Sequence, residues 1–232
     1  MSRSGDNKTY MTSPARMALL LMVLTICGLA WWTYNQTDLR MRDDLLQQAG
    51  IVAQSIRLNR VMALNGAESD LSDHNYLRLK SQLMHLRHAN PRCRFLYILG
   101  RHEDGTIFFH VDSEPEGSKD ESPPGQTYDE APASFHEVFI NGEGKVVGPV
   151  NDRWGTWVTA LVPLNSPPNA KPVAVLGMDI DAKTWKWEVF SVVALHAGLM
   201  LVLVFVVGSM WFAVRKFESS ETGSRLTRAK ID

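Results

Sequence analysis

Residues 94–112 read RFLYILGRHEDGTIFFHVD, and this stretch decides the fold. Two runs rich in aromatic and branched residues, 94–99 and 106–111, have the composition of β-strands. Between them stands Asp104-Gly105, a dipeptide typical of two-residue hairpin loops. The stretch therefore predicts an antiparallel β-hairpin in the middle of the chain.

The register of this hairpin follows from its loop. If Asp104-Gly105 is the loop, counting back places Leu99 opposite His110 and Tyr97 opposite Asp112. One face then holds Leu96, Ile98, Phe109 and Val111, and the other holds Phe95, Tyr97, Leu99, Phe108, His110 and Asp112. The apolar face suits packing against a helix, and the mixed face suits a small ligand.

Helical periodicity dominates the residues before the hairpin. Residues 37–64 carry an apolar stripe at Leu45, Ala49, Val52 and Ile56, which predicts one long amphipathic helix that stops at Asn65-Gly66. A second helix follows, with Tyr76, Leu79, Leu83 and Leu86 on one face, and ends at Asn90-Pro91.

After the hairpin, the pattern predicts the rest of an antiparallel sheet. Residues 113–129 are acidic and rich in Pro, Ser and Gly, as in a binding lid or a mobile segment. A short helix is expected over 130–140, and strands are expected over 145–150, 157–163 and 173–180, the last two joined by a turn at 165–169. The fold class is therefore α+β, with a long N-terminal helix packed on an antiparallel sheet.

Two apolar segments have the length and borders of transmembrane helices. The first, 17–34, ends in Trp31, Trp32 and Tyr34, and the second, 189–214, is closed by Arg215 and Lys216. Basic residues at the outer ends of the pair, including Arg3, Lys8, Arg16, Arg225 and Arg228, place both termini in the cytoplasm. The expected division is 1–16 cytoplasmic, 17–34 span, 35–188 periplasmic domain, 189–214 span and 215–232 cytoplasmic tail.

The first span also allows other readings. Gly28-Leu29-Ala30 is a passable cleavage site for a signal peptide. A lipoprotein signal at Cys27 is less well supported, because the bulky Ile26 precedes the cysteine. The aromatic belt and the helical pattern that continues beyond it favour a membrane anchor.

Composition and residue spacing exclude several other classes of protein. A formal net charge of -1, with scattered Lys and Arg, argues against a nucleic-acid partner. The two cysteines lie in different environments and predict no disulfide framework. His85 and His88 stand one helical turn apart, but no cysteine or carboxylate at ligand spacing accompanies them, so neither a metal nor another cofactor is expected.

Several short motifs together resemble one family of domains. These are FLYILGR at 95–101, VDSEP at 111–115, SPPGQ at 122–126, DRWGTWV at 152–158 and LGMDID at 176–181. The set resembles Cache, or extracytoplasmic PAS-like (PDC), sensor domains of bacterial kinases, cyclases and chemoreceptors. The resemblance covers about residues 37–188 and implies a PAS-like sheet in a periplasmic ligand sensor of the inner membrane. Family members usually continue into a kinase or cyclase output, which this sequence does not contain.

The candidate ligand-binding residues are polar or aromatic groups near these motifs. Arg153, framed by Trp154 and Trp157, suits a carboxylate, with a surface turn as the alternative. Asp179 in an apolar strand needs a partner, either a ligand amine or the following turn that it would cap. The hairpin adds Tyr97, His110 and Asp112, for each of which a structural hydrogen bond is the alternative.

These residues together suggest a zwitterion or carboxylate ligand, such as an amino acid. The predicted function is a homodimeric small-molecule sensor that passes ligand binding through its spans to a cytoplasmic partner of the two-component or cyclase type. The sequence shows no catalytic set and predicts no enzyme activity. A membrane-anchored scaffold, or a periplasmic enzyme of unknown activity, is the alternative.

Overall fold

The computed structural model describes residues 13–165 and 171–228. Residues 38–188 form one compact unit, and the described residues on either side of it belong to a second unit. Arg3 and Lys8, and positions 166–169 of the expected turn, lie outside the described residues.

The helices before the sheet differ in one respect from the expectation. Helix α1 (Ser13–Ser55) ends before Asn65-Gly66, because Arg57 adopts an extended backbone (φ -79°, ψ 103°) that interrupts the helical hydrogen bonds. A one-turn helix, α2 (Leu58–Val61), and a 3-10 helix, η1 (Glu68–Ser72), follow before α3 (His74–Ala89). The prediction of one unbroken helix over 37–64 was therefore wrong.

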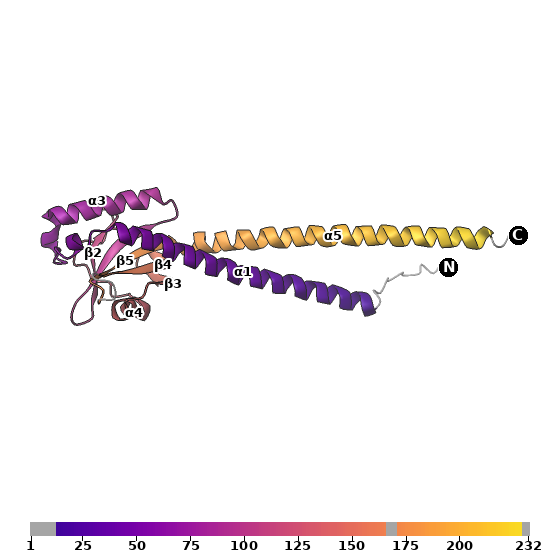
Figure 1. The fold of residues 1–232 in the computed structure, drawn as a ribbon, viewed down its shortest axis with the longest axis horizontal. Helices are drawn as coiled ribbons and strands as arrows, with labels where there is room; N and C mark the ends of the chain where they lie inside the picture. Colours follow the sequence, from indigo (N-terminus) through magenta and orange to yellow (C-terminus); the bar gives the residue numbers. More distant parts are fainter. Residues whose placement is uncertain (1–12, 166–170, 229–232) are drawn as a thin grey trace, which may run out of the picture. The chain divides into compact units, whose positions relative to one another are not determined.

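The five strands form one antiparallel sheet, as Figure 1 shows. They are β1 (Phe95–Arg101), β2 (Ile107–Asp112), β3 (Lys145–Asp152), β4 (Gly155–Leu164) and β5 (Ala174–Asp181), in the order β2-β1-β5-β4-β3. The last strand of the chain thus lies in the middle, with β1 and β4 as its neighbours. Helix α4 (Ala133–Asn141) precedes β3, and α5 (Ala182–Arg228) begins directly after β5.

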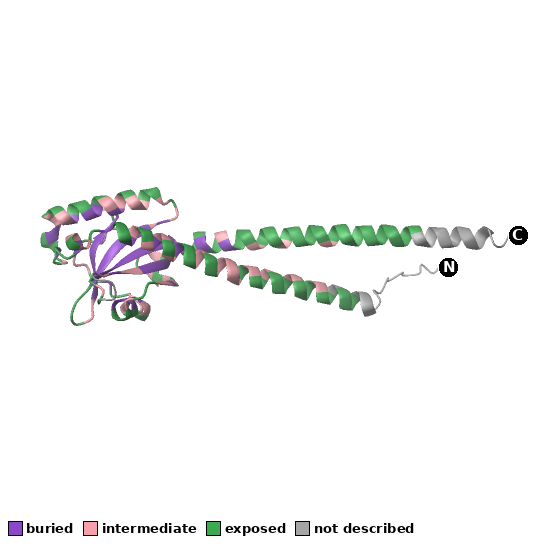
Figure 2. Ribbon diagram, in the orientation of Figure 1, coloured by how far each residue is buried: buried purple, intermediate pink, exposed green. Residues whose placement is uncertain are grey.

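Helices cover both faces of this sheet, which confirms the predicted fold class. Helix α3 contacts β1 and β2, whereas α4 contacts β4 and β5 from the opposite side (Figure 1). The side chain of Gln82 on α3 donates to the carbonyl of Ser55, so the end of α1 lies beside α3. The predicted stripe on α1 is largely buried: Leu45 and Ala49 are at most 1% exposed. Figure 2 shows β1, β2 and β5 almost wholly buried, whereas the residues of the edge strand β3 are mostly half-buried or exposed.

The hairpin loop is one residue longer than expected. The N–H of His102 donates to the carbonyl of Thr106 at 2.9 Å, which leaves three residues, 103–105, in the loop. Asp104 accepts a hydrogen bond from the N–H of Thr106 through Oδ1, and Gly105 has a φ of +96°. A glycine with positive φ is what a three-residue hairpin loop requires at this position.

A β-bulge corrects the register further along the strands. Leu99 pairs with Phe109, Tyr97 pairs with Asp112, and the register shifts between Ile98 and Leu99. His110 is the extra residue that the bulge accommodates. The predicted Tyr97–Asp112 pair is therefore confirmed, and the predicted Leu99–His110 pair was wrong.

The bulge also moves side chains from one face of the sheet to the other. Phe109 packs against Tyr97, with ring centroids 5.5 Å apart, on the face covered by α4. Phe108 and His110 lie on the opposite face, where a Cβ added to Gly100 would collide with both rings. The expectation that His110 shares a face with Tyr97 was wrong, because one inserted residue reverses the alternation of side chains.

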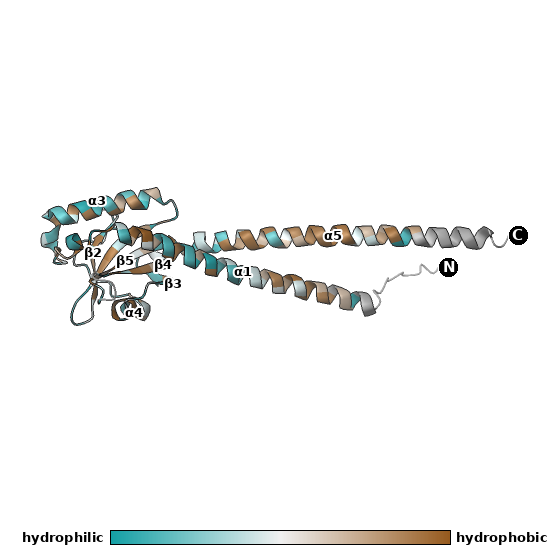
Figure 3. Cartoon of the chain, in the orientation of Figure 1, coloured by the Kyte–Doolittle hydropathy of each residue, from teal (hydrophilic) through white to brown (hydrophobic). Residues whose placement is uncertain are grey.

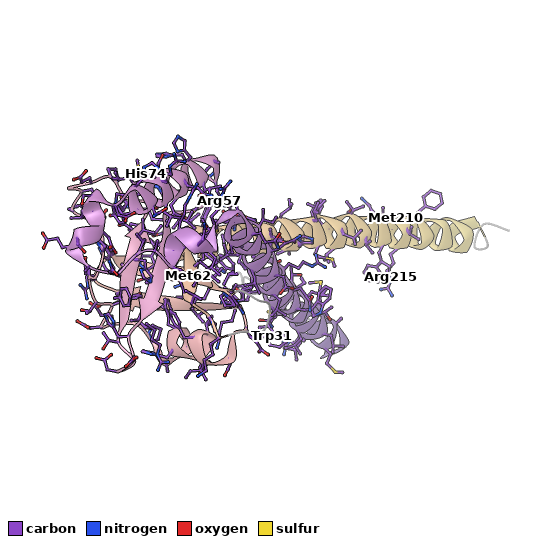
Figure 4. The ribbon with its side chains drawn as sticks, turned by 60° about the vertical axis from the view of Figure 1, so that its left-hand side comes forward. Trp31, Arg57, Met62, His74, Met210 and Arg215 are labelled. Carbon is purple, nitrogen blue, oxygen red and sulfur yellow. The ribbon has the colours of Figure 1, made fainter. Side chains whose placement is uncertain are left out.

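Two helices of the chain are long and apolar enough to cross a membrane. They run over Arg16–Ser55 and Ala182–Phe217, and Figure 3 shows hydrophobic residues along much of both. Trp31 on α1 and Met210 on α5 are about 70% exposed and project from their helices (Figure 4). The Arg215 guanidinium lies over the ring of Trp211, 4.3 Å from its centroid. Length and composition therefore agree with the two expected spans.

Candidate functional site

A small cavity lies at the α4-covered face of the sheet, next to the acidic segment 113–129. Its lining residues are Phe95, Leu96, Tyr97, Phe109, Asp112, Ser113, Asp120, Ser122, Tyr128, Asp152, Trp154 and Asp179. The cavity measures about 20 Å³, little more than the space that one water molecule needs. A larger ligand therefore requires the lining residues to rearrange. Four of the lining side chains are aspartates, and five are aromatic.

Asp179 on β5 is the most deeply buried of these carboxyl groups, with 4% of its surface exposed. The hydroxyls of Thr159 and Tyr97 donate to its Oδ1, at 2.7 Å and 3.1 Å. Burial raises the pKa of Asp179 to about 7, because desolvation penalises the charged form more than these two hydroxyls stabilise it. Among the described residues, no basic side chain forms an ion pair with Asp179.

Asp179 is not the cap of the following helix. The N–H groups of Lys183 and Thr184 donate to Asp181 instead, at 2.8 Å and 2.9 Å. Asp181 thus occupies the N-cap position of α5, two residues after Asp179. The capping alternative for Asp179 therefore falls away, and its carboxyl group lines the cavity.

Asp152, the last residue of β3, brings a second carboxylate that forms no ion pair among the described residues. Its Oδ1 accepts hydrogen bonds from the N–H groups of Trp154 and Gly155 and from the indole of Trp157, all between 2.9 Å and 3.0 Å. Its Oδ2 accepts the hydroxyl of Tyr128 at 2.8 Å. The negative charge of Asp152 contributes to the raised pKa of Asp179. The sequence analysis did not predict Asp152 or Tyr128 as site residues. An Asp three residues before a Gly, as in Asp152-Arg153-Trp154-Gly155, is nevertheless typical of a turn.

Asp112, at the other end of the lining, has its own cation. Lys80 on α3 donates to Asp112 at 2.9 Å and to Glu121 at 2.8 Å, and all three side chains are nearly buried. The N–H of Ser122 donates to the second oxygen of Asp112 at 2.7 Å. Burial raises the pKa of Asp112, and Lys80 opposes this shift. These bonds fasten the acidic segment to α3 and β2.

The aromatic side chains form a continuous wall. Phe109 lies between Tyr97 and Trp154, with ring centroids 5.5 Å and 5.7 Å away, and Tyr128 lies 6.0 Å from Trp154. These edge-to-face contacts leave aromatic faces and edges around the aspartates. The wall suits an organic ligand with a positive charge, because aromatic faces attract cations.

The structure brings together four of the seven predicted site residues. Tyr97, Asp112, Trp154 and Asp179 all line the cavity. Trp157 packs its ring against Phe95 and donates to Asp152, one layer behind the lining.

The other two predicted residues lie elsewhere. Arg153 binds Glu130 through two hydrogen bonds of 2.8 Å and 2.5 Å, and its guanidinium lies 5.0 Å from the ring centroid of Trp154. His110 lies on the opposite face of the sheet, where burial lowers its pKa to about 4. Its Nδ1 is buried without a hydrogen-bond partner among the described residues.

No metal centre can be assembled from the part of the chain that the structure describes. These residues contain no group of three or more His, Cys, Asp or Glu side chains that could hold a metal ion. The aspartates of the cavity are spread along its wall and bonded to protein donors.

Comparison with known proteins finds similarity in structure only. No protein-family model matches the chain, and no curated protein matches it. The ligand-binding domain of the Campylobacter jejuni chemoreceptor Tlp3, solved with L-valine, matches at 14% identity and a TM-score of 0.47, over 80% of this chain and 68% of that one. The sensory domain of the same receptor, solved with isoleucine, matches at 13% identity and a TM-score of 0.46 over the same shares. Each of these is a solved structure to which the chain is similar over the stated shares.

Proposed function

We propose that the chain is a membrane-anchored extracytoplasmic sensor for a small organic amine. The observation that carries the proposal is Asp179, a buried carboxyl group that lines the aromatic cavity and forms no ion pair among the described residues. Asp152 adds the charge of a second, half-buried carboxylate to the same cavity. Burying a carboxylate is costly unless a cation or several donors meet it. A protonated amine supplies both a positive charge and three donors.

The aromatic wall supports the same ligand class. An ammonium group on Asp179 would lie among the rings of Tyr97, Phe109 and Trp154, where cation–π attraction adds to the charge-assisted hydrogen bond. An amino acid satisfies the same requirement through its amino group. Its carboxylate would need a separate donor, and the binding of that carboxylate by Arg153 remains a prediction.

Membrane anchoring is the second part of the proposal. The apolar stretches 17–34 of α1 and 189–214 of α5, with basic residues at their outer ends, support two spans with both termini in the cytoplasm. A phosphatase reporter fused after Lys216 should be inactive if the topology is as proposed. Activity of that fusion, or a mature chain that starts near Trp31, would contradict it.

Transmission of the signal follows from the order of elements. Asp179 lies two residues before Asp181, the N-cap of α5, so a shift of β5 on ligand binding moves the start of that helix. The cytoplasmic partner is proposed to be a two-component kinase or a cyclase. Dimerisation through the second span is proposed because Ala194 and Gly198 form a pair of small residues four positions apart, which lets two helices approach closely.

Calorimetry on the full chain in detergent tests the ligand class. Phenethylamine, a protonated amine on an aromatic ring, should bind, and its neutral analogue 2-phenylethanol should not. Asp179→Asn keeps an acceptor for Thr159 and Tyr97 but removes the charge, so it should weaken binding about ten- to a hundredfold. Equal binding of the two probes, or no effect of Asp179→Asn, would refute the amine proposal. Failure of a wider set of amines to bind would favour a scaffold.

A further inference from the structure

The side chain of Arg94 contacts two groups of the cavity lining, the carboxylate of Asp120 and the ring of Phe95. Its Nη2 lies 2.7 Å from Oδ2 of Asp120, and its guanidinium carbon lies 4.0 Å from the ring centroid of Phe95. Asp120 and Phe95 both line the cavity, whereas Arg94 does not. The guanidinium therefore sits at the border of the cavity and binds a carboxylate and an aromatic face from outside it.

A carboxylate and an aromatic ring are also the groups that an amine ligand would use. Cations bind aromatic faces and carboxylates by the same electrostatic attraction, whether they come from the protein or from a ligand. Within the described residues, Asp120 has no other ion pair. A ligand amine that reaches this end of the cavity must therefore compete with Arg94 for Asp120.

Of the two cations that bind carboxylates of the cavity lining, Arg94 is displaced at less cost than Lys80. Its side chain is 37% exposed, whereas that of Lys80, which holds Asp112, is 9% exposed. Arg94 has a second carboxylate to retain, because its Nη1 lies 2.8 Å from Glu114. Glu114 itself is also bound by Arg87. Releasing Asp120 thus leaves Arg94 paired and leaves no buried charge alone.

We propose that Arg94 is an internal competitor that lowers the affinity of the sensor for its ligand. Without ligand, its guanidinium takes the place of the ligand amine on Asp120 and Phe95. When an amine enters with its ammonium group on Asp179, a remaining N–H of that group takes over Asp120, and Arg94 stays on Glu114. The proposal rests on the proposed function, since it requires a cationic ligand.

The test compares Arg94→Gln with a matched control in the full chain in detergent. Lys145→Gln removes the same charge from an ion pair of similar exposure, with Glu137, whose residues do not line the cavity. Arg94→Gln should bind phenethylamine about two- to fivefold more tightly than the wild type, the range expected for loss of an exposed competing ion pair. Lys145→Gln should bind it with wild-type affinity. Melting curves followed by circular dichroism serve to check that both variants are folded.

A double variant makes the mechanism specific. If the gain comes from a freed Asp120, Arg94→Gln should bring no gain in a chain that already carries Asp120→Asn. The competitor proposal would be wrong if Arg94→Gln binds phenethylamine no more tightly than the wild type does, while Asp179→Asn weakens binding as expected. Arg94 would then only hold the acidic segment in place. Absence of amine binding in every variant would overturn the proposed function and this inference together.

Discussion

Asp112 and Asp179 line the same cavity and are almost equally buried, yet they are stabilised in opposite ways. Asp112 has a lysine at 2.9 Å and a backbone N–H at 2.7 Å, whereas Asp179 has two hydroxyls and no basic side chain among the described residues. Burial takes the pKa of Asp179 to about 7. The comparison teaches that a buried carboxylate with its own cation fastens the fold, and one without a cation is available to a ligand.

The largest expected effect on stability comes from removing Lys80, the cation that binds Asp112 and Glu121. Lys80→Met leaves Asp112 and Glu121 buried without a positive charge, which should destabilise the domain by about 3 kcal/mol or more. For a chain of this length, that corresponds to a melting temperature lower by roughly 6–12 °C. Near-ultraviolet circular dichroism of the full chain in detergent measures it.

The control for this variant is an exposed ion pair of the same kind. Lys145→Met breaks the bond to Glu137, whose side chain is 52% exposed, and should cost less than about 1 kcal/mol. If Lys80→Met and Lys145→Met melt at the same temperature, the buried network does not fasten the acidic segment.

An intermediate effect on stability and on ligand binding is expected from the titration of Asp179 with pH. Because the pKa of Asp179 is raised in the folded state, its contribution to stability is full below about pH 4 and is lost as the pH rises through about 7. Amine binding should rise over the same range, since the ligand requires the carboxylate. Melting curves and calorimetry between pH 5 and 8 on the wild type and Asp179→Asn measure both trends.

The difference in pH-dependent stability between the wild type and Asp179→Asn isolates the contribution of Asp179. The pKa of His110 is lowered to about 4 by burial, so its contribution to stability is lost as the pH falls and opposes that of Asp179. His110 is unchanged in Asp179→Asn and cancels in the comparison. Identical pH profiles of stability for the two proteins would contradict the raised pKa of Asp179.

The smallest effect on stability is expected from Arg153→Ala. Its ion pair with Glu130 is exposed, so the loss should stay below about 1 kcal/mol. Binding separates its two possible roles. If Arg153 leaves Glu130 for a ligand carboxylate, Arg153→Ala should weaken phenylalanine binding about ten- to a hundredfold and leave phenethylamine binding unchanged. An equal effect on the binding of both ligands would show that Arg153 does not bind the ligand carboxylate.

Local patterns in the sequence predicted the elements of the fold closely. The strands expected over 145–150, 157–163 and 173–180 are found over 145–152, 155–164 and 174–181, and the helix expected over 130–140 is α4, 133–141. Such elements depend on the alternation of neighbouring residues and on turn residues, which are visible in the sequence itself. Asp179 stood out for the same reason, as a carboxylate in an apolar strand.

Side-chain placement at the site depended on details that local patterns do not contain. One extra residue in the loop and one bulge at His110 exchanged the faces of Phe109 and His110, and no alternation rule locates a bulge. The breakpoint in the predicted long helix was likewise invisible, because residues 56–57 carry no Gly or Pro to mark it.

The sequence by itself determined which segments are helix, strand and apolar span, because each is set by the periodicity of a few adjacent residues. The tertiary structure alone decided which charges meet. Lys80 reaches Asp112 across 32 positions and Glu121 across 41, and Arg153 reaches Glu130 across 23. Strand order places β5 between β1 and β4, so Asp179 meets Tyr97 and Thr159 from distant parts of the chain. Long-range packing of this kind depends on the whole fold, and it separates the aspartates that fasten the domain from those that can bind a ligand.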